Sequence, residues 1–132
     1  MIDKPRRRLW DRISGAAPTF IAVECRITGD VETDGAVVLC GTIVGDGRIG
    51  TILRMPRGSV WRGEVHASDA LIAGSIEGRL LIAGKLEIGA AAMLRGPVRA
   101  GSIAIAKGAV VEGEMQVTGA GPIVHFEEKR SS

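Results

Sequence analysis

The first of six similar units in this chain is Ile27-Thr28-Gly29-Asp30-Val31, in which apolar residues stand two positions before and two positions after a glycine. The central glycines of the six units lie 15 to 18 residues apart. A repeat of this length is typical of a solenoid, in which each winding packs only on its neighbours. The six units are Ile27–Val31, Ile43–Gly47, Trp61–Val65, Ile76–Leu80, Leu94–Val98 and Val111–Met115.

Apolar residues occupy every second position in short stretches around these units, as in Leu80, Ile82, Leu86 and Ile88. A period of two is characteristic of a β-strand, whose side chains alternate between two faces. A winding of 15 to 18 residues holds about three short strands and three bends. The sequence therefore predicts an all-β solenoid of about six windings, with each strand paired in parallel to the windings above and below.

Alignment of the six units on their glycines predicts two rows of side chains that stack inside the solenoid. Gly47 is the one residue in these rows that is not apolar, and Trp61 is large for an inward position. The first row is Ile27, Ile43, Trp61, Ile76, Leu94 and Val111, and the second is Val31, Gly47, Val65, Leu80, Val98 and Met115.

The composition fits a single domain inside a reducing compartment. Nineteen of the 132 residues are glycine, and only two phenylalanines and two tryptophans are present. We expect Cys25 and Cys40 to be small buried free thiols. No apolar stretch approaches the ~18 residues of a membrane span or forms the core of a signal peptide. The expected location is the cytoplasm.

The charge divides the chain into three parts. Residues 1–20 carry a net charge of +3 and the remaining residues −1, so the repeat region shows no basic excess that favours a nucleic-acid partner. We predict a basic arm over residues 1–17, a solenoid domain over 18–118 and a short tail over 119–132.

The motifs with catalytic residue types lack the required context. The segment 45–50 has the spacing GxGxxG, but no helix is predicted after it to bind a pyrophosphate. The run His66-Ala67-Ser68-Asp69 favours a polar turn over a catalytic triad. Carboxylates such as Asp30, Glu64 and Glu77, as well as Glu112 and Glu114, are expected on a solvated face. We predict no catalytic residue, cofactor, metal or nucleotide.

The basic arm has the pattern of a short segment that is disordered or partly helical. Pro5 suits a first helical turn and Ser14-Gly15 suits its end. An apolar face surrounded by arginines is typical of weak binding to an anionic membrane surface. A solubilising tail and a docking peptide for a partner protein are the alternatives. The candidate contact residues are Arg6, Arg7, Arg8, Leu9, Trp10 and Ile13.

The segment Thr19-Phe20-Ile21-Ala22, followed by the first repeat unit, resembles the opening of the bactofilin domain. The segment 74–80 resembles its repeat, and the segment 107–115 resembles its last winding. The resemblance implies a right-handed β-helix of triangular cross-section that polymerises end to end without nucleotide. It also implies a bacterial cytoskeletal scaffold at the inner membrane, linked to cell shape and to recruitment of cell-wall enzymes.

The chain departs from the family pattern at Gly47 and at Trp61. It also has Val111 where the family often has phenylalanine, and residues 55–57 (Met-Pro-Arg) interrupt one winding.

End-to-end polymerisation places the contacts on the first and last windings. Phe20 and Phe126 flank the repeats, and each is either a plug of the core or a contact between subunits. The predicted interface residues are Phe20, Ile21, Val23, Val111, Met115, Val117 and Phe126.

Two other classes of protein share this kind of coil. One is an adaptor that does not polymerise, which a discrete, concentration-independent mass would reveal. The other is a left-handed β-helix acyltransferase or a metal-dependent hydratase. Those enzymes have a strict six-residue repeat and use histidines, whereas here the windings vary in length and the chain has two histidines.

Overall fold

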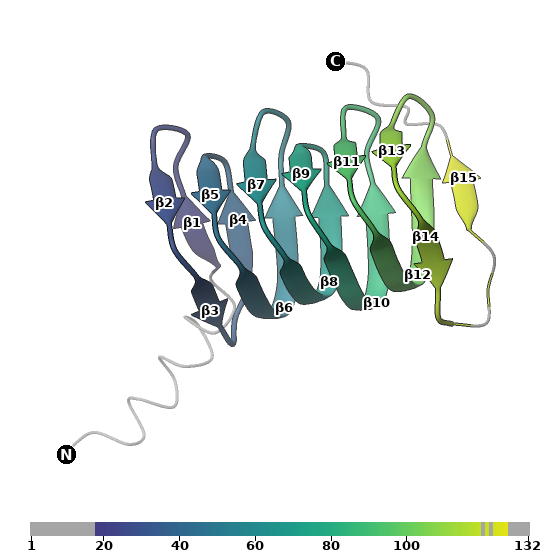
Figure 1. Cartoon of the computed structure of the whole chain (residues 1–132), viewed down its shortest axis with the longest axis horizontal. Coiled ribbons are helices and arrows are strands. Elements are labelled where there is room, and N and C mark those ends of the chain that lie inside the picture. Colours follow the sequence, from purple (N-terminus) through teal and green to yellow (C-terminus); the bar gives the residue numbers. More distant parts are fainter. Residues whose placement is uncertain (1–17, 120, 122, 127–132) are drawn as a thin grey trace.

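The fold is an uninterrupted coil of short parallel strands. The computed structural model describes residues 18–119, 121 and 123–126, and these residues form fifteen β-strands and no helix. The chain rises along the back of the coil, crosses over the top and descends in front while it advances from one end to the other (Figure 1). This sense is right-handed. The predicted right-handed β-helix is confirmed, and the left-handed enzyme folds do not match this chain.

Each turn has three faces, which gives the triangular cross-section. Face 1 contains the second halves of the long strands β6 (Gly47–Met55), β8 (Val65–Ile72), β10 (Leu80–Ile88) and β12 (Val98–Ala106), together with β1 (Thr19–Ile21), β4 (Val37–Leu39) and β15 (Val124–Phe126). Face 2 contains β2 (Arg26–Thr28), β5 (Thr42–Val44), β7 (Val60–Arg62), β9 (Ser75–Glu77), β11 (Met93–Arg95) and β13 (Val110–Glu112). Face 3 contains β3 (Val31–Thr33), the first halves of β6 (Gly47–Met55), β8 (Val65–Ile72), β10 (Leu80–Ile88) and β12 (Val98–Ala106), and β14 (Met115–Val117).

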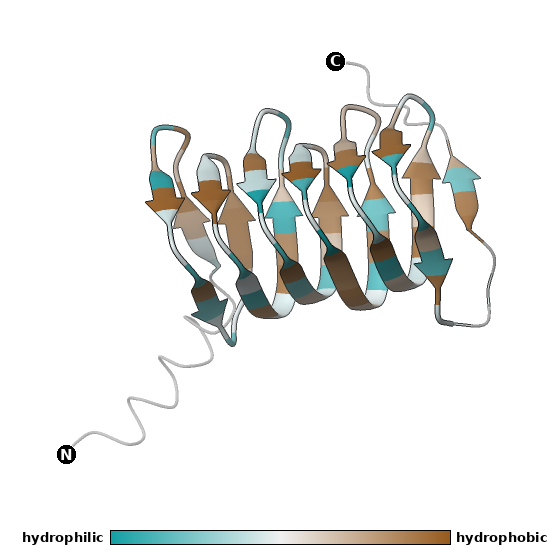
Figure 2. Ribbon diagram, viewed as in Figure 1, coloured by the Kyte–Doolittle hydropathy of each residue, from teal (hydrophilic) through white to brown (hydrophobic). Residues whose placement is uncertain are grey.

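The register confirms both predicted inward rows residue by residue. On face 2, Ile43 lies beside Ile27 on one side and Trp61 on the other, and the same pairing continues to Val111. On face 3, the second row runs in the same way from Val31 to Met115. Hydrophobic and hydrophilic bands alternate along the strands (Figure 2). The solenoid thus has one continuous aliphatic interior.

The central glycines of the repeat form the corner between face 2 and face 3. All six have φ between 130° and 148°, a region that other residues rarely adopt. A Cβ atom on Gly63 would also collide with the carbonyl oxygen of Gly45 on the preceding turn, and one on Gly78 would collide with Gly63. Each corner therefore lies on the bare backbone of the corner before it, and both the conformation and the lack of space require glycine.

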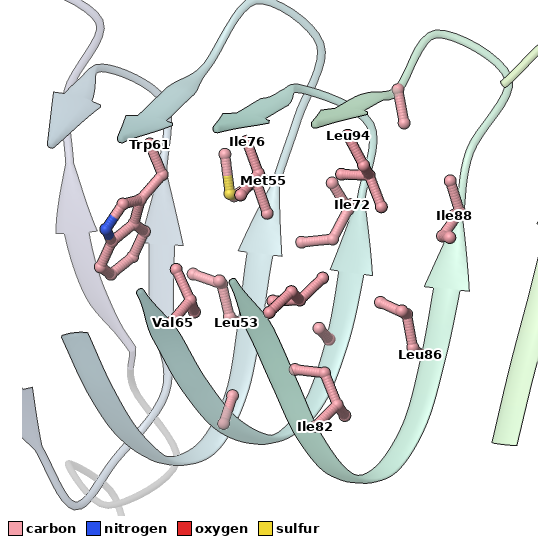
Figure 3. Packing of buried hydrophobic residues seen from close by; sticks show 14 of the residues in the cluster. Leu53, Met55, Trp61, Val65, Ile72, Ile76, Ile82, Leu86, Ile88 and Leu94 are labelled. Carbon is pink, nitrogen blue, oxygen red and sulfur yellow. The ribbon is translucent and has the colours of Figure 1, made fainter. Parts of the chain in front are cut away.

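The two departures inside the rows, Gly47 and Trp61, compensate for each other. Trp61 is fully buried, and its side chain points from face 2 into the interior (Figure 3). A Cβ atom on Gly47 would overlap the six-membered ring of Trp61. The indole Nε1 donates a hydrogen bond of 2.8 Å to the carbonyl oxygen of Gly45. The missing side chain on one turn is thus the space that the tryptophan of the next turn fills.

The interruption of the repeat at residues 55–57 lies at the corner between face 1 and face 2. Met55 still points into the core and is fully buried. The carbonyl oxygen of Pro56 accepts hydrogen bonds from Ser59 N (3.2 Å) and Ser59 Oγ (2.6 Å), which close a tight turn. Gly58 provides the positive φ of 93° that this turn needs. The proline changes the corner without shifting the register of the strands that follow.

The two cysteines depart from the expected burial. Both are free thiols, but Cys25 is exposed and Cys40 is half-buried. The prediction of buried thiols is therefore wrong for Cys25, which lies on the first turn and, within residues 18–126 as described, has a turn on one side of it only.

The terminal segments are described in part. Strand β15 belongs to the predicted tail, and it pairs with β12 over Ala104–Ala106, so it adds one more strand to face 1. The predicted arm, residues 1–17, lies outside the described residues. The boundaries at 18 and 118 remain predictions.

We expect Gly78→Ala to destabilise the solenoid by about 2 kcal/mol or more, because it adds backbone strain and a steric collision at a stacked corner. Gly35→Ala is the matched control, since the nearest atom to its added Cβ is at an ordinary 3.9 Å. Urea denaturation followed by circular dichroism measures both. Equal stability of the two variants would show that the corner glycines are not required.

The packing of Trp61 against Gly47 predicts strong coupling in a double-mutant cycle. Gly47→Val alone overpacks the core and Trp61→Leu alone leaves a cavity, and each change costs about 1–4 kcal/mol. In the double variant the valine occupies space that the indole vacates, so we expect a coupling energy of about 1–3 kcal/mol. Denaturant unfolding of the four proteins measures it. Additivity within about 0.5 kcal/mol would contradict the proposed compensation.

Candidate assembly surfaces

Both ends of the coil present open strand edges. At the N-terminal end, β1, β2 and β3 each pair with one neighbouring strand among the described residues. At the C-terminal end the same holds for β13, β14 and β15. An edge strand offers a row of backbone N–H and C=O groups that can pair with another chain. Each end of the rod therefore carries three such rows, one on each face.

The inward rows lose their cover at the same two ends. Ile27 and Val31 on the first turn are half-buried, whereas their counterparts in the middle of the coil are fully buried. Val111 and Met115 on the last turn are half-buried in the same way. Apolar core side chains thus meet solvent at both ends, and a second molecule stacked on either end would complete their burial.

The three predicted contact residues of the N-terminal end differ in how exposed their side chains are. Phe20 is 64% exposed and lies beside Val38 on the outer side of face 1, so it is not a plug of the core. Val23 is 76% exposed at the following corner. Ile21 is 5% exposed and belongs to the core.

Ile27 and Val31 also belong to this end, where both pack against the core from the first turn, but they are not among the predicted contact residues. The signal that identifies them was present, because they are the first members of the two inward rows.

The predicted contact residues of the C-terminal end lie on three faces. Val111 is on face 2, and Met115 and Val117 are on face 3, where all three pack half-buried against the core. Phe126 is half-buried on β15 of face 1 and lies beside Ala106. Ile123, which sequence analysis did not select, also packs against the core just before β15.

The outer side of face 2 carries paired charges. On face 2, Arg62 lies 3.7 Å from Glu77 and Arg95 lies 3.5 Å from Glu112, in each case between neighbouring turns. These four side chains are about half exposed or more, so each pair contributes little to stability. Alternating charge along the axis keeps this side solvated. The sides thus carry charged pairs beside single exposed apolar residues such as Leu71 and Met93, whereas the ends present open strand edges and half-buried core side chains.

The predicted acidic positions also support the corners. The backbone N–H of Asp46 donates to Asp30 Oδ1 at 3.1 Å, and that of Glu64 donates to Asp46 Oδ1 at 3.0 Å. Carboxylates at this corner thus accept hydrogen bonds from the next turn.

The residues of the triad-like run do not form a triad. His66 Nε2 lies 2.7 Å from Glu64 Oε2, whereas Ser68 Oγ donates to Gly50 O and Asp69 Oδ1 accepts from Lys85 N. The GxGxxG segment leads directly into strand β6. Within the described residues there is no group of three or more histidine, cysteine or acidic side chains placed to hold a metal ion.

The predicted membrane contacts, Arg6, Arg7, Arg8, Leu9, Trp10 and Ile13, lie outside the described residues. The part of the chain that the structure describes contains no helix long and apolar enough to cross a membrane.

The fold and its ends define a class of protein: a right-handed β-solenoid whose terminal turns present open strand edges and half-buried core residues. The family model for bactofilins, described as polymer-forming cytoskeletal, matches residues 19–116. Because this match covers most of the chain, the protein belongs to the bactofilin family. No curated protein and no solved structure matches the chain.

Proposed function

We propose that this protein is a cytoskeletal scaffold that polymerises end to end, through its first and last turns, into filaments that need no nucleotide. The observation that carries the proposal is the half-burial of the inward rows at both ends, at Ile27 and Val31 and at Val111 and Met115. Membership of a polymer-forming cytoskeletal family supports self-association and a structural rather than a catalytic role.

Stacking two ends would remove apolar surface from water and pair open edges at the same time. Burial contributes about 0.8 kcal/mol of free energy per CH₂ group. Each half-buried aliphatic side chain at an end still has CH₂ and CH₃ groups in water that stacking would bury. Association of two proteins costs about 4–15 kcal/mol in lost rigid-body freedom, so one side chain is not sufficient. Several side chains and three strand edges at each end supply contacts over all three faces. Neither kind of contact requires nucleotide hydrolysis.

The proposed location is the inner face of the cytoplasmic membrane. Arginines and a tryptophan in the arm, Arg6 to Ile13, are the residue types that bind anionic lipid surfaces. One arm of this length binds weakly, but a filament displays one arm per subunit and gains avidity. A filament held there would position cell-wall enzymes and so influence cell shape.

We expect Met115→Arg to abolish or strongly shorten filaments, because it places an unpaired charge where two ends meet. Gln116→Arg is the matched control, since this neighbouring side chain is exposed on the outer side of face 3. Negative-stain electron microscopy without nucleotide measures filament length, and circular dichroism checks that both variants are folded.

Filaments of normal length in folded Met115→Arg would place the C-terminal contact elsewhere. A discrete mass for the wild-type protein that does not change with concentration would instead favour the adaptor that does not polymerise.

The membrane proposal predicts that the full chain pellets with vesicles containing anionic lipid and that a variant lacking residues 1–17 does not. Vesicles of neutral lipid are the control, and raised salt should release the full chain because lipid attraction is screened. Equal pelleting of both proteins would remove the arm from membrane binding.

A further inference from the structure

A shallow groove of about 460 Å³ lies on the outer surface of face 3 and reaches the last turn at Thr118. Its lining residues come from β6, β8, β10, β12 and Thr118, so the groove crosses five successive turns. Since the strands of one face lie side by side along the coil, the groove runs parallel to the axis of the solenoid.

The groove combines two positive charges with an apolar middle. Arg48, His66, Leu81 and Arg99 form a single outward row, in that order, on four neighbouring strands. The other lining residues are small or aliphatic, of which Ile49, Ala67 and Ile82 belong to the buried core, and none of the lining residues is acidic. Glu32, on the preceding turn, is the outward neighbour of Arg48 in this row, but it lies outside the groove lining and these two side chains form no ion pair.

Neighbouring side chains hold two members of this row in place. Arg99 donates through Nε (3.3 Å) and Nη2 (3.1 Å) to Gln116 Oε1 on the next turn. A guanidinium has five N–H donors, so the others remain to bind a ligand. The carboxylate of Glu64, the residue just before β8, lies 2.7 Å from His66 through Oε2 and Nε2. These contacts orient the row and draw the adjacent acidic group toward the imidazole.

The spacing of the row matches that of an extended peptide. Arg48 and Arg99 are three strand spacings apart, about 14 Å at ~4.8 Å per strand. An extended chain rises ~3.3 Å per residue, so residues i and i+4 are about 13 Å apart and point to the same side as residue i+2. Carboxylates four residues apart would thus reach both arginines, while the side chain between them would meet His66 and Leu81.

We propose that the groove binds an extended peptide segment of a partner protein with the pattern acidic, any, apolar, any, acidic. Each arginine takes one carboxylate, for which its planar guanidinium is well shaped, and Leu81 receives the central apolar side chain. The few charges and the lack of a Phe, Tyr or Trp among the lining residues disfavour nucleic acid, whose binding relies on many phosphate contacts and on base stacking. In a filament the groove would recur once per subunit.

The test measures binding of a fluorescein-labelled peptide containing Glu-Thr-Leu-Thr-Glu by fluorescence polarisation. The proteins are the full chain, Arg48→Glu, Arg99→Glu and their double variant. Arg54→Glu is the matched control, because Arg54 is an exposed arginine on the same strand as Arg48 but on face 1. We expect each groove variant to bind at least about tenfold more weakly and the control to bind normally.

Two further peptides make the result specific. We expect the double variant to bind Lys-Thr-Leu-Thr-Lys, which the wild type rejects, and this charge-swap rescue also shows that the variant is folded. A peptide with its glutamates three residues apart should bind weakly to the wild type. The same assay on Met115→Arg separates peptide binding from polymerisation, since the groove is on the side of the coil.

Three outcomes would overturn the assignment. One is equal binding by the groove variants and by Arg54→Glu. Another is failure of the lysine peptide to bind the double variant. The third is displacement of the labelled peptide by inorganic phosphate, or by an oligonucleotide of equal charge, at the concentration at which unlabelled peptide displaces it. That result would show that the groove attracts anions in general and does not recognise the peptide.

Discussion

The contact of each corner glycine with the backbone of the preceding turn is the constraint on which the rest of this structure depends. With no Cβ atom at Gly45, Gly63 or Gly78, consecutive turns approach until their strands hydrogen-bond on all three faces. That approach fixes the register, and the register places each inward side chain directly over the one below. The aliphatic interior, the outward charge pairs and the groove on face 3 all follow from this stacking.

A coil stacked in this way gains its stability from each neighbouring pair of turns, and it has no natural end. Among the residues that the structure describes, every interior turn is covered twice, whereas the first and last turns are covered once. Half-buried Ile27 and Met115 are thus the consequence of stopping a repeat, not of a special interface sequence. Compact folds close their core with other elements, but here the described residues leave it open along the axis. The proposed self-association along this axis would extend the same contacts that hold the turns together.

The repeat predicted the fold because residues at the same position of successive units lie beside each other on neighbouring turns. An alignment of the units on their glycines therefore shows directly which side chains stack. Both inward rows were correct in every member. Gly47 and Trp61 each appeared as a separate departure from the repeat. Their contact joins two different inward rows on adjacent turns, and an alignment of one row at a time does not show it. Phe20 could not be oriented from sequence, because it precedes the first glycine and the alternation there has no repeat to anchor it. The burial of Cys25 was predicted wrongly for a related reason. A position that is buried on an interior turn can be exposed on a terminal turn.

The same geometry gives the ends and the sides of the coil different recognition chemistry. At an end, the interacting groups are backbone edges and core side chains, which are nearly alike in every solenoid of this type, so they favour another copy of the same chain. Along a side, each turn contributes one freely variable outward residue at intervals of about 4.8 Å. A row such as Arg48, His66, Leu81 and Arg99 can therefore carry sequence-specific information without disturbing the core. Under these two proposals, polymerisation and partner selection would use different residues of the same coil.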